Sequence, residues 1–561
     1  MKNAKCWTTV AIILFILGAL LLAAGLVVQL SVFPNVVKKG IDKGKVLGLN
    51  SDGSFNSFTN SWANPQYIST MQYWTMDYKN PIGMLNRALY PDVLEKGPYS
   101  YTEKMLSDNI NFSDDGKRMN FTQKTTYFFN AAKSCPTCNP YVDTVTVPDI
   151  SFILAMNAIE QAVEKFLATP LLGTICKKLH KEELCGNIAT IIERELGTAM
   201  DLFGIGPFVT VTVDQLIFSG YNTPVVDKLV NRVIKILNEM IGTDLIPQQP
   251  PVPVNLNSGN GTADFQYTVL TGKTDPQLSG FIQSFISTTN ATGMSSNGDM
   301  LPPNWWPKAN TGNCTGDNGI HALKIFGTNA DFFKSHIQKT DKLPLYIDDV
   351  CRSSLLVYDR DVTVQGIKAY RFVLPASEFD WTEPSNCGFC VPLAYGAYNL
   401  PKNSTCMPSG LLDISGCSAG APIMISKAHF YQAHPLVQSF VPRFKPNYDD
   451  DETTLDIEPN TGTVLNANKR LQINVFMNQM PHIAAYSVLR PGAYPLVRLN
   501  ESFVMDQGTK DQLNSQLFVP QKVITIICWT SVGVGGFLMA LSVIILLITF
   551  CVKRETDKKE N

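Results

Sequence analysis

Two long apolar runs, one near each end of the chain, dominate the pattern of hydrophobic and polar positions. No charged residue occurs over 6–37 or over 523–552. A helix of about 20 apolar residues is long enough to cross the hydrocarbon core of a bilayer. The pattern therefore predicts two transmembrane helices, over 10–30 and 523–552.

Each apolar run has an alternative explanation. The first could be a cleaved signal peptide, since residues 23–25 are small, but the apolar part of a signal peptide has only about 7–15 residues. An uncleaved anchor is therefore favoured. The second could be a lipid-anchor signal, which would end in apolar residues, whereas this chain ends in the charged segment 553–561.

Positive charges beside the spans predict the orientation of the chain. Two lysines in residues 1–9 and four Lys or Arg residues in 553–561 flank the spans on one side. Such residues are enriched on the cytoplasmic side, although Lys38 and Lys39 weaken the bias. Both short ends are therefore predicted to be cytoplasmic.

Seven Asn-x-Ser/Thr sequons support this topology, because all of them lie between the spans. They are at Asn111, Asn120, Asn260, Asn290, Asn313, Asn403 and Asn500. N-Glycans are added to segments outside the cytoplasm, and one sequon alone is a weak signal. Residues 31–522 are therefore predicted to form one glycosylated ectodomain.

Much of this ectodomain has the pattern of strands. Residues 99–147 and 344–500 contain short extended runs separated by Gly, Pro, Asn and Asp, such as 124–129, 370–374 and 471–476. β-Branched and aromatic residues between turn residues are typical of strands. These parts predict a large antiparallel sheet.

A helical block, about 150–241, interrupts the strands. Its apolar residues recur at intervals of three and four, as at Ile153, Met156 and Ile159, which is the spacing of one face of a helix. The Pro- and Asn-rich stretch 246–260 is predicted to be a linker. The predicted fold class is α+β.

Composition and charge exclude several classes of function. Of the 561 residues, 17% are charged, below the roughly 25% of an average soluble domain. The net charge is −2, whereas a nucleic-acid-binding protein shows a basic face. No phosphate-binding loop or metal motif stands out, and the acidic run 449–452 is more often a solvated loop than a cation site. We expect no cofactor, no metal and no nucleic-acid partner.

The 13 cysteines divide by compartment. Cys6, Cys528 and Cys551 lie in or beside the spans, and Cys6 and Cys551 are candidates for S-palmitoylation or ordinary reduced thiols. Ten lie in the predicted ectodomain, where disulfides are the default. These ten are Cys135, Cys138, Cys176, Cys185, Cys314, Cys351, Cys387, Cys390, Cys406 and Cys417. Their pairing does not follow from the sequence itself.

Two motifs resemble catalytic ones. Residues 416–420 match G-x-S-x-G around Ser418, but a nucleophile elbow needs a strand-to-helix turn, and a strand-like segment follows at 421–426. The C-x-x-C pairs at 135–138 and 387–390 could be redox or zinc half-sites, but neither begins a βαβ unit, so structural disulfides are favoured. We predict no catalytic residue.

Other motifs occur in a fixed order along the chain. The N-terminal ones are Phe33-Pro34-Asn35-Val36-Val37, Trp62-Ala63-Asn64-Pro65, Asn80-Pro81 and Glu95-Lys96-Gly97-Pro98-Tyr99-Ser100-Tyr101. The C-terminal ones are Cys351-Arg352-Ser353, Gly366-Ile367, Tyr370-Arg371-Phe372-Val373-Leu374-Pro375, Cys387-Gly388-Phe389-Cys390, Leu412-Asp413-Ile414-Ser415-Gly416-Cys417 and Leu455-Asp456-Ile457-Glu458-Pro459. Together they resemble the class B scavenger receptors, which include the fatty-acid translocase, the high-density-lipoprotein receptor and the lysosomal integral membrane protein.

The resemblance implies a fold and a set of disulfides. It implies an antiparallel, β-barrel-like ectodomain that encloses an apolar tunnel, with the helical block as a membrane-distal bundle. The family's ladder of six cysteines implies the pairs Cys314–Cys387, Cys351–Cys417 and Cys390–Cys406. The remaining cysteines depart from the ladder, and proximity suggests Cys135–Cys138 and Cys176–Cys185.

The resemblance also implies a class of ligand. Family members bind lipids such as fatty acids, cholesterol or its esters, and lipoprotein or other anionic particles. Clustered cations on the helical cap would steer anionic particles to it, and the candidates here are Lys177, Lys178, His180 and Lys181. The alternative is a solvated loop neutralised by Glu182 and Glu183.

The expected function is that of a plasma-membrane receptor, not an enzyme, that binds lipids or lipoproteins and facilitates lipid uptake. A homo-oligomer is one option for its assembly. The alternative is a protein-binding receptor that sorts a lysosomal hydrolase or recognises particles. The tail 553–561 contains neither a dileucine nor a Tyr-x-x-apolar motif, which favours the plasma membrane over the lysosomal membrane.

Overall fold

A computed structural model of the chain describes residues 2–65, 69–154, 206–221, 254–257, 259–289, 293–391, 406–418, 420–478 and 488–560, with residues 156, 235 and 398. The chain divides into two compact units. One consists of residues 1–46 and 505–561, and the other of residues 47–504. Each unit is described by itself.

The first unit contains two long helical segments. The N-terminal segment joins α1 (Lys2–Val27), a π-helical turn (Val28–Val32) and α2 (Phe33–Gly44). The C-terminal segment joins α13 (Gln507–Leu513), a second π-helical turn (Asn514–Phe518) and α14 (Val519–Glu560). Both are long and apolar enough to cross a membrane. The helices extend beyond the predicted spans, because helical structure continues into flanking polar residues.

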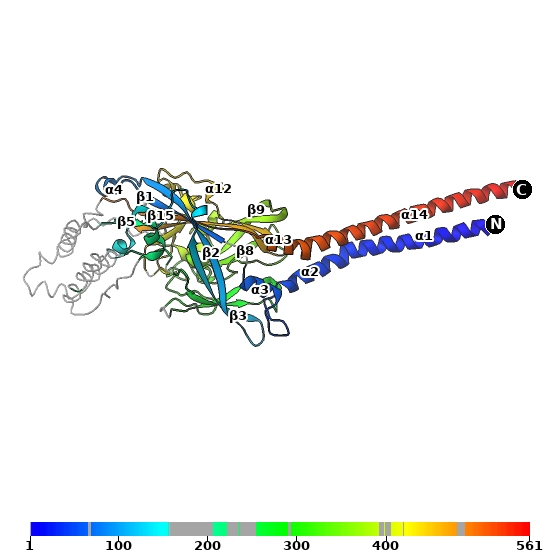
Figure 1. Cartoon of the computed structure of the whole chain (residues 1–561), viewed down its shortest axis with the longest axis horizontal. Helices are drawn as coiled ribbons and strands as arrows, with labels where there is room; N and C mark the ends of the chain where they lie inside the picture. The colour runs from blue at the N-terminus through cyan, green and yellow to red at the C-terminus, as the bar shows by residue number, and fades with distance from the viewer. Residues whose placement is uncertain are drawn as a thin grey trace, which may run out of the picture. The chain divides into compact units, whose positions relative to one another are not determined.

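A seam of small residues, spaced by seven, joins α1 and α14, which run side by side in Figure 1. A Cβ atom added at Gly18 would lie 2.6 Å from the carbonyl oxygen of Gly535, and one added at Gly25 would lie 2.9 Å from that of Cys528. The hydroxyl of Ser542 donates to the carbonyl oxygen of Ala11 at 2.7 Å. Close approach of small residues is how helices associate in lipid.

The second unit is built on one antiparallel sheet of 13 strands. The strand order is β7-β6-β3-β2-β1-β15-β14-β13-β10-β9-β8, and β12 branches from β14 and pairs with β11. The first half comprises β1 (Ser69–Tyr78), β2 (Val93–Phe112), β3 (Arg118–Phe129), β6 (Phe265–Leu270) and β7 (Ile282–Ser287). The second half comprises β8 (Lys342–Ile347), β9 (Arg352–Val364), β10 (Ile367–Val373), β11 (Leu412–Asp413), β12 (Ile423–Ser426), β13 (Thr454–Glu458), β14 (Thr463–Met477) and β15 (Gly492–Val504). Figure 1 draws β1 and β15 side by side in the middle of this order.

The two ends of the sheet are bridged by the segment 327–328, so the sheet is nearly a closed barrel. The backbone N–H of Ile282 on β7 donates to Gly327, and that of Tyr346 on β8 donates to Thr328. Gly327 has φ +97°, and a Cβ there would lie 2.3 Å from the carbonyl carbon of Pro344. Only glycine fits this close passage.

Short helices precede β1 or lie in the connections between strands. They are α3 (Ser57–Ala63), α4 (Pro81–Arg87), α10 (Gly316–His321), α11 (Pro435–Gln438) and α12 (Tyr448–Asp451). In α12, Asp451 is fully buried, and so is the following Glu452 at 2% exposure. The expectation of a solvated acidic loop is therefore wrong for these two residues.

The predicted α+β class and the antiparallel, barrel-like sheet are confirmed, and the three strand examples lie in β3, β10 and β14. The helical block needs a correction. It begins as a helix at 150–154, but β5 (Phe208–Thr212) pairs with β4 (Thr144–Pro148) in a separate two-stranded sheet. The alternating Val209 and Val211 are the local sign of that strand.

Four disulfides occur among the described residues. Three are the pairs that the resemblance implies, Cys314–Cys387, Cys351–Cys417 and Cys390–Cys406, and the fourth is Cys135–Cys138. Cys176 and Cys185 lie outside the described residues. Cys6 and Cys551 are free and exposed, whereas Cys528 is free and buried in the helical seam.

Candidate ligand-binding interior

The strand register places acidic and aromatic side chains on one face of the sheet. Directly opposed residues of antiparallel strands point to the same face. Glu103 of β2 lies opposite Tyr127 of β3, and Glu501 of β15 lies opposite Lys469 of β14. Strand β1 lies between β2 and β15, and its register joins the two pairs on the same face.

That face is the inner face of the curled sheet. The Nζ atom of Lys469 lies 2.5 Å from Oδ2 of Asp349, which is in a turn between β8 and β9, although three strands separate β14 from β8. The hydroxyl of Tyr267 on β6 donates to Oδ2 of Asp348 at 3.2 Å. Side chains from such distant strands meet only inside a curled sheet. We define the interior cluster as Glu103, Asp348, Asp349, Lys469 and Glu501.

Lys469 is the cation of the interior cluster. Its Nζ atom also lies 3.1 Å from Oε2 of Glu501. Burial opposes the charge on Lys469, but Asp349 and Glu501 outweigh burial and raise its pKa well above the usual value. Lys469 in turn lowers the pKa of Asp349. One fixed positive charge is therefore shared by two carboxylates.

The other two carboxyl groups of the interior cluster are harder to ionise. Burial, followed by the charge of Glu501, raises the pKa of Glu103 to about 8. Desolvation by the surrounding protein, followed by the charge of Asp349, raises the pKa of Asp348 to about 6, although the residue itself is exposed to solvent. Glu103 is 6% exposed, and its Oε2 atom has no hydrogen-bond partner among the described residues. The cluster therefore contains more carboxyl groups than Lys469 can neutralise.

An aromatic wall, made of Tyr73, Tyr101, Tyr127 and Phe218, lies beside Glu103. The ring of Phe218 lies 4.8 Å from that of Tyr101, 5.7 Å from that of Tyr127 and 6.1 Å from that of Tyr73. Burial, followed by the charge of Glu103, raises the pKa of Tyr127. The wall gives the interior an apolar surface next to a buried carboxyl group.

Part of this inner face is accessible to solvent. The side chain of Asp349 is 63% exposed, and those of Lys469 and Glu501 are 27% and 26% exposed. Apolar residues on the same face are only partly buried, namely Tyr127, Phe129, Leu499 and Phe503. Solvent therefore reaches both the charged and the apolar parts of this face.

A second ionic network is largely buried and has a structural role. Nδ1 of His429 lies 2.7 Å from Oδ1 of Asp451, and its Nε2 lies 3.4 Å from Oε1 of Glu95. Burial opposes charging, but these hydrogen bonds outweigh it and raise the pKa of His429 to about 9. Lys427 and Glu452, each 2% exposed, form a further pair at 2.7 Å.

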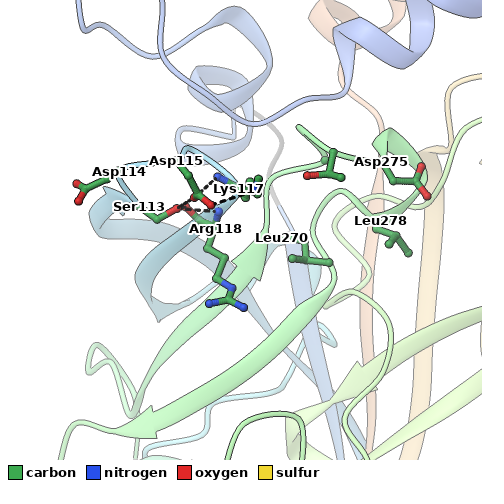
Figure 2. Close-up of a pocket in the computed structure, with 10 residues that line it drawn as sticks. Ser113, Asp114, Asp115, Lys117, Arg118, Leu270, Asp275 and Leu278 are labelled. Atoms are coloured by element: carbon green, nitrogen blue, oxygen red, sulfur yellow. Dashed lines mark hydrogen bonds and ion pairs between the residues drawn. The ribbon is translucent and has the colours of Figure 1, made fainter.

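A surface hollow of about 660 Å³ lies between the β2–β3 turn and the loop after β6, and Figure 2 draws residues that line it. One of its three aspartates is engaged in the turn: Oδ1 of Asp115 accepts from the hydroxyl of Ser113 and the backbone N–H of Lys117. The backbone hydrogen bond from Lys117 and the hydroxyl of Ser113 lower the pKa of Asp115 to about 2. Asp115 therefore stabilises the β2–β3 turn.

Several predicted site residues lie outside the described residues. They are Lys177, Lys178, His180 and Lys181 of the cationic loop and the sequons Asn290 and Asn403. Among the other sequons, Asn111, Asn120, Asn260 and Asn313 are exposed, and their glycosylation stays a prediction. Palmitoylation of Cys6 and Cys551 also stays a prediction.

Asn500 has different surroundings from the exposed sequons. It lies within β15, is 8% exposed, and its Nδ2 donates to Oε1 of Gln72 at 3.3 Å. A glycan on Nδ2 requires this hydrogen bond to break, and glycosylation at Asn500 stays a prediction. The tripeptide pattern is local, whereas burial of this residue depends on the neighbouring strands.

Ser418 lies in the turn between β11 and β12, which makes the G-x-S-x-G segment strand–turn–strand. The preceding Cys417 is bonded to Cys351. His429 is engaged with Asp451, as described above. This setting differs from the strand-to-helix turn of a nucleophile elbow.

The interior cluster was missed by sequence analysis. Its members come from β2, β14, β15 and the β8–β9 turn, and no spacing along the chain connects them. One signal was available: Glu103 sits between Tyr101 and Met105 at alternate positions of a strand, where an apolar residue is usual on a buried face. The partners of Glu103 still depend on the register.

Two membrane-crossing helices and a nearly closed antiparallel barrel between them define a two-span membrane protein with one large domain between the spans. A family model described as the CD36 family matches residues 16–546. The chain belongs to the CD36 family, and the resemblance to class B scavenger receptors is confirmed.

Relatives in other organisms agree with this assignment. An uncharacterised protein of Caenorhabditis elegans is 53% identical over an alignment of 563 positions, which covers 100% of this chain and 99% of the relative. Lysosome membrane protein 2 of Homo sapiens is 28% identical over 91% of this chain and 88% of its own length. Scavenger receptor class B member 1 of Sus scrofa is 25% identical over 95% of this chain and 89% of its own length.

Proposed function

We propose that this protein is a cell-surface receptor that binds lipids or lipoproteins and lets lipid pass through the interior of its barrel. The observation that carries the proposal is the apolar, partly exposed lining of the inner face. Moving an acyl chain from water onto such a surface is favourable by about 0.8 kcal/mol per methylene group. The relative named scavenger receptor class B member 1 supports a receptor role.

Filling the interior tests the proposal. Ala467 lies opposite Phe503 on the inner face, and Asn468 points to the other face of the same strand. In cells that express the full chain, Ala467→Trp should reduce uptake of a fluorescent fatty acid or cholesteryl ester to near the level of untransfected cells. Asn468→Trp, at equal surface expression, should retain it.

Mass spectrometry of the purified full chain provides a second measurement. Long-chain lipid should copurify with the wild-type protein and should be depleted in Ala467→Trp. If the wild-type protein retains no lipid and expressing cells take up no more lipid than controls, the proposal is wrong.

A protein-binding receptor of the lysosomal membrane is the second candidate. The observation in its favour is the higher identity to lysosome membrane protein 2, 28%, than to scavenger receptor class B member 1, 25%. A tagged full chain found only in lysosomes, with a copurifying soluble hydrolase, would favour it. Residence at the cell surface would favour the first candidate.

A further inference from the structure

The interior contains two features that a simple apolar conduit does not need. One is a buried carboxyl oxygen without a partner, Oε2 of Glu103. The other is a set of four carboxyl groups around a single ammonium group, Lys469. A buried polar atom without a hydrogen bond is costly in a folded protein. A ligand that reaches this oxygen from the solvent-accessible part of the same face would complete its bonding.

We propose that the interior cluster and the aromatic wall form a binding site for the ammonium group of a long-chain amphiphile. This inference rests on the proposed function, in which lipids enter the barrel. The ammonium group lies at Oε2 of Glu103, and the apolar chain lies along the aromatic wall and the partly buried residues beyond it.

The charges of the interior cluster select a cation. Lys469 is already shared between Asp349 and Glu501 at 2.5 and 3.1 Å, so it is not free to bind a carboxylate headgroup. Asp348 accepts a hydrogen bond from Tyr267 but has no lysine or arginine partner in the described ion pairs. A fatty acid would place another anion beside these groups, whereas an ammonium group balances them.

The aromatic wall favours the same ligand. The faces of tyrosine and phenylalanine rings attract ammonium groups, and cages of aromatic rings bind quaternary ammonium ligands. Tyr127 lies opposite Glu103 in the strand register, and Phe218 packs against three rings of the wall. A carboxyl group at the border of an aromatic surface can bind a primary amine by hydrogen bonding and a choline-type group by charge.

Binding measurements on the purified full chain in nanodiscs test the site. The probes are octadecylamine, octadecyltrimethylammonium and stearate, which share a chain length and differ in headgroup. Wild-type protein should bind the two cations about tenfold more tightly than stearate, because a close charge pair in a partly buried site is worth at least that factor.

Variants locate the effect. Glu103→Gln keeps the shape and removes the carboxylate that Glu103 forms when it releases its proton and pairs with an ammonium group. It should weaken octadecylamine binding about tenfold while leaving stearate binding unchanged or improved. Tyr127→Leu should weaken octadecyltrimethylammonium binding about threefold, the lower end of cation–π effects. Glu383→Gln, on an exposed residue, is the matched control and should change nothing. A melting curve for each variant verifies folding.

The outcomes separate this inference from the proposed function. Equal affinity for all three probes, or amine binding that is insensitive to both Glu103→Gln and Tyr127→Leu, would overturn the ammonium site while leaving lipid binding in place. Failure to bind any of the probes would overturn the proposed function as well.

Discussion

Arg352 illustrates how a single residue organises the disulfide-rich side of the barrel. It is 2% exposed, and its guanidinium group donates to the carbonyl oxygen and to Oε2 of Glu378, at 2.7 and 2.8 Å. It also lies 3.8 Å from the ring centre of Phe389. Burial lowers the pKa of Arg352 to about 10. The preceding Cys351 forms a disulfide with Cys417. An ion pair, a cation–π contact and a disulfide therefore lie close together at this point of the chain.

Arg352→Met should destabilise the folded domain by about 3–5 kcal/mol, because it leaves the partner carboxylate of a buried pair uncompensated. Arg360→Met is the matched control, since Arg360 is half-exposed and pairs with Asp359 at the surface, where such pairs are worth about 1 kcal/mol or less. Chemical denaturation of the purified full chain measures both. Equal effects of the two substitutions would contradict this role of Arg352.

At the scale of elements, small residues allow the two terminal helices to pack closely against each other. Ala11, Gly18 and Gly25 on α1 face Ser542, Gly535 and Cys528 on α14. Both series have a spacing of seven, which keeps one narrow stripe of each helix against the other. In lipid the hydrophobic effect does not hold helices together, so close packing at small residues does. The stripe also explains why Cys528 is buried while Cys6 and Cys551 are exposed.

Gly18→Leu should separate the two helices, because a Cβ at this position already lies 2.6 Å from a backbone oxygen. Cysteines placed at Ala11 and Ser542, with Cys6, Cys528 and Cys551 changed to serine, report the contact by oxidative cross-linking. We expect strong cross-linking with Gly18 and little with Gly18→Leu. Gly533→Leu, where a Cβ would meet nothing within 4 Å, should cross-link as well as the parent chain. Undiminished cross-linking in Gly18→Leu would contradict the close packing of α1 against α14 at Gly18.

At the scale of the whole molecule, two buried groups with raised pKa values make the folded state less stable as the pH rises. The pKa of His429 is about 9 in the folded state against 6.5, and that of Glu103 is about 8 against 4.5. In both cases the folded chain holds a proton that the unfolded chain releases at lower pH. Their contributions are complete below pH 6.5 and pH 4.5, respectively, and are lost as the pH rises through 9 and 8.

The ectodomain should therefore melt about 2–5 °C higher at pH 5.5 than at pH 8, for a contribution of a few kcal/mol in a domain of this size. Carboxylates with lowered pKa values, such as Asp341 and Asp361, lose their contributions only in more acidic solution. Thermal melting of the full chain across this range measures the effect. The double variant Glu103→Gln, His429→Asn should flatten the dependence, since asparagine tolerates the positive φ of His429. A higher melting temperature at pH 8 would contradict the prediction.

A structural feature of this molecule can be predicted from the sequence when its physical cause lies in neighbouring residues. Membrane spans require continuous apolar runs, and strand alternation and helical spacing repeat within a few residues, so these elements were predictable. The disulfides Cys314–Cys387, Cys351–Cys417 and Cys390–Cys406 were predicted from the family resemblance. The burial of Asn500 could not be predicted because burial is not a local property, and strand β5 was missed because it lies inside a block with helical spacing.

By itself, the sequence determined the two spans, the α+β class and the family, because each depends on neighbouring residues or on ordered motifs. Only the tertiary structure decided which side chains share the interior. Ser69 lies opposite Glu103 and Met71 opposite Glu501, and these pairings are set by the register of strands that are distant in the sequence. The curl of the sheet then brings Lys469 to Asp349. A site built from such contacts exists only after the barrel has formed, because burial and charge there come from strands that the chain supplies at widely separated points.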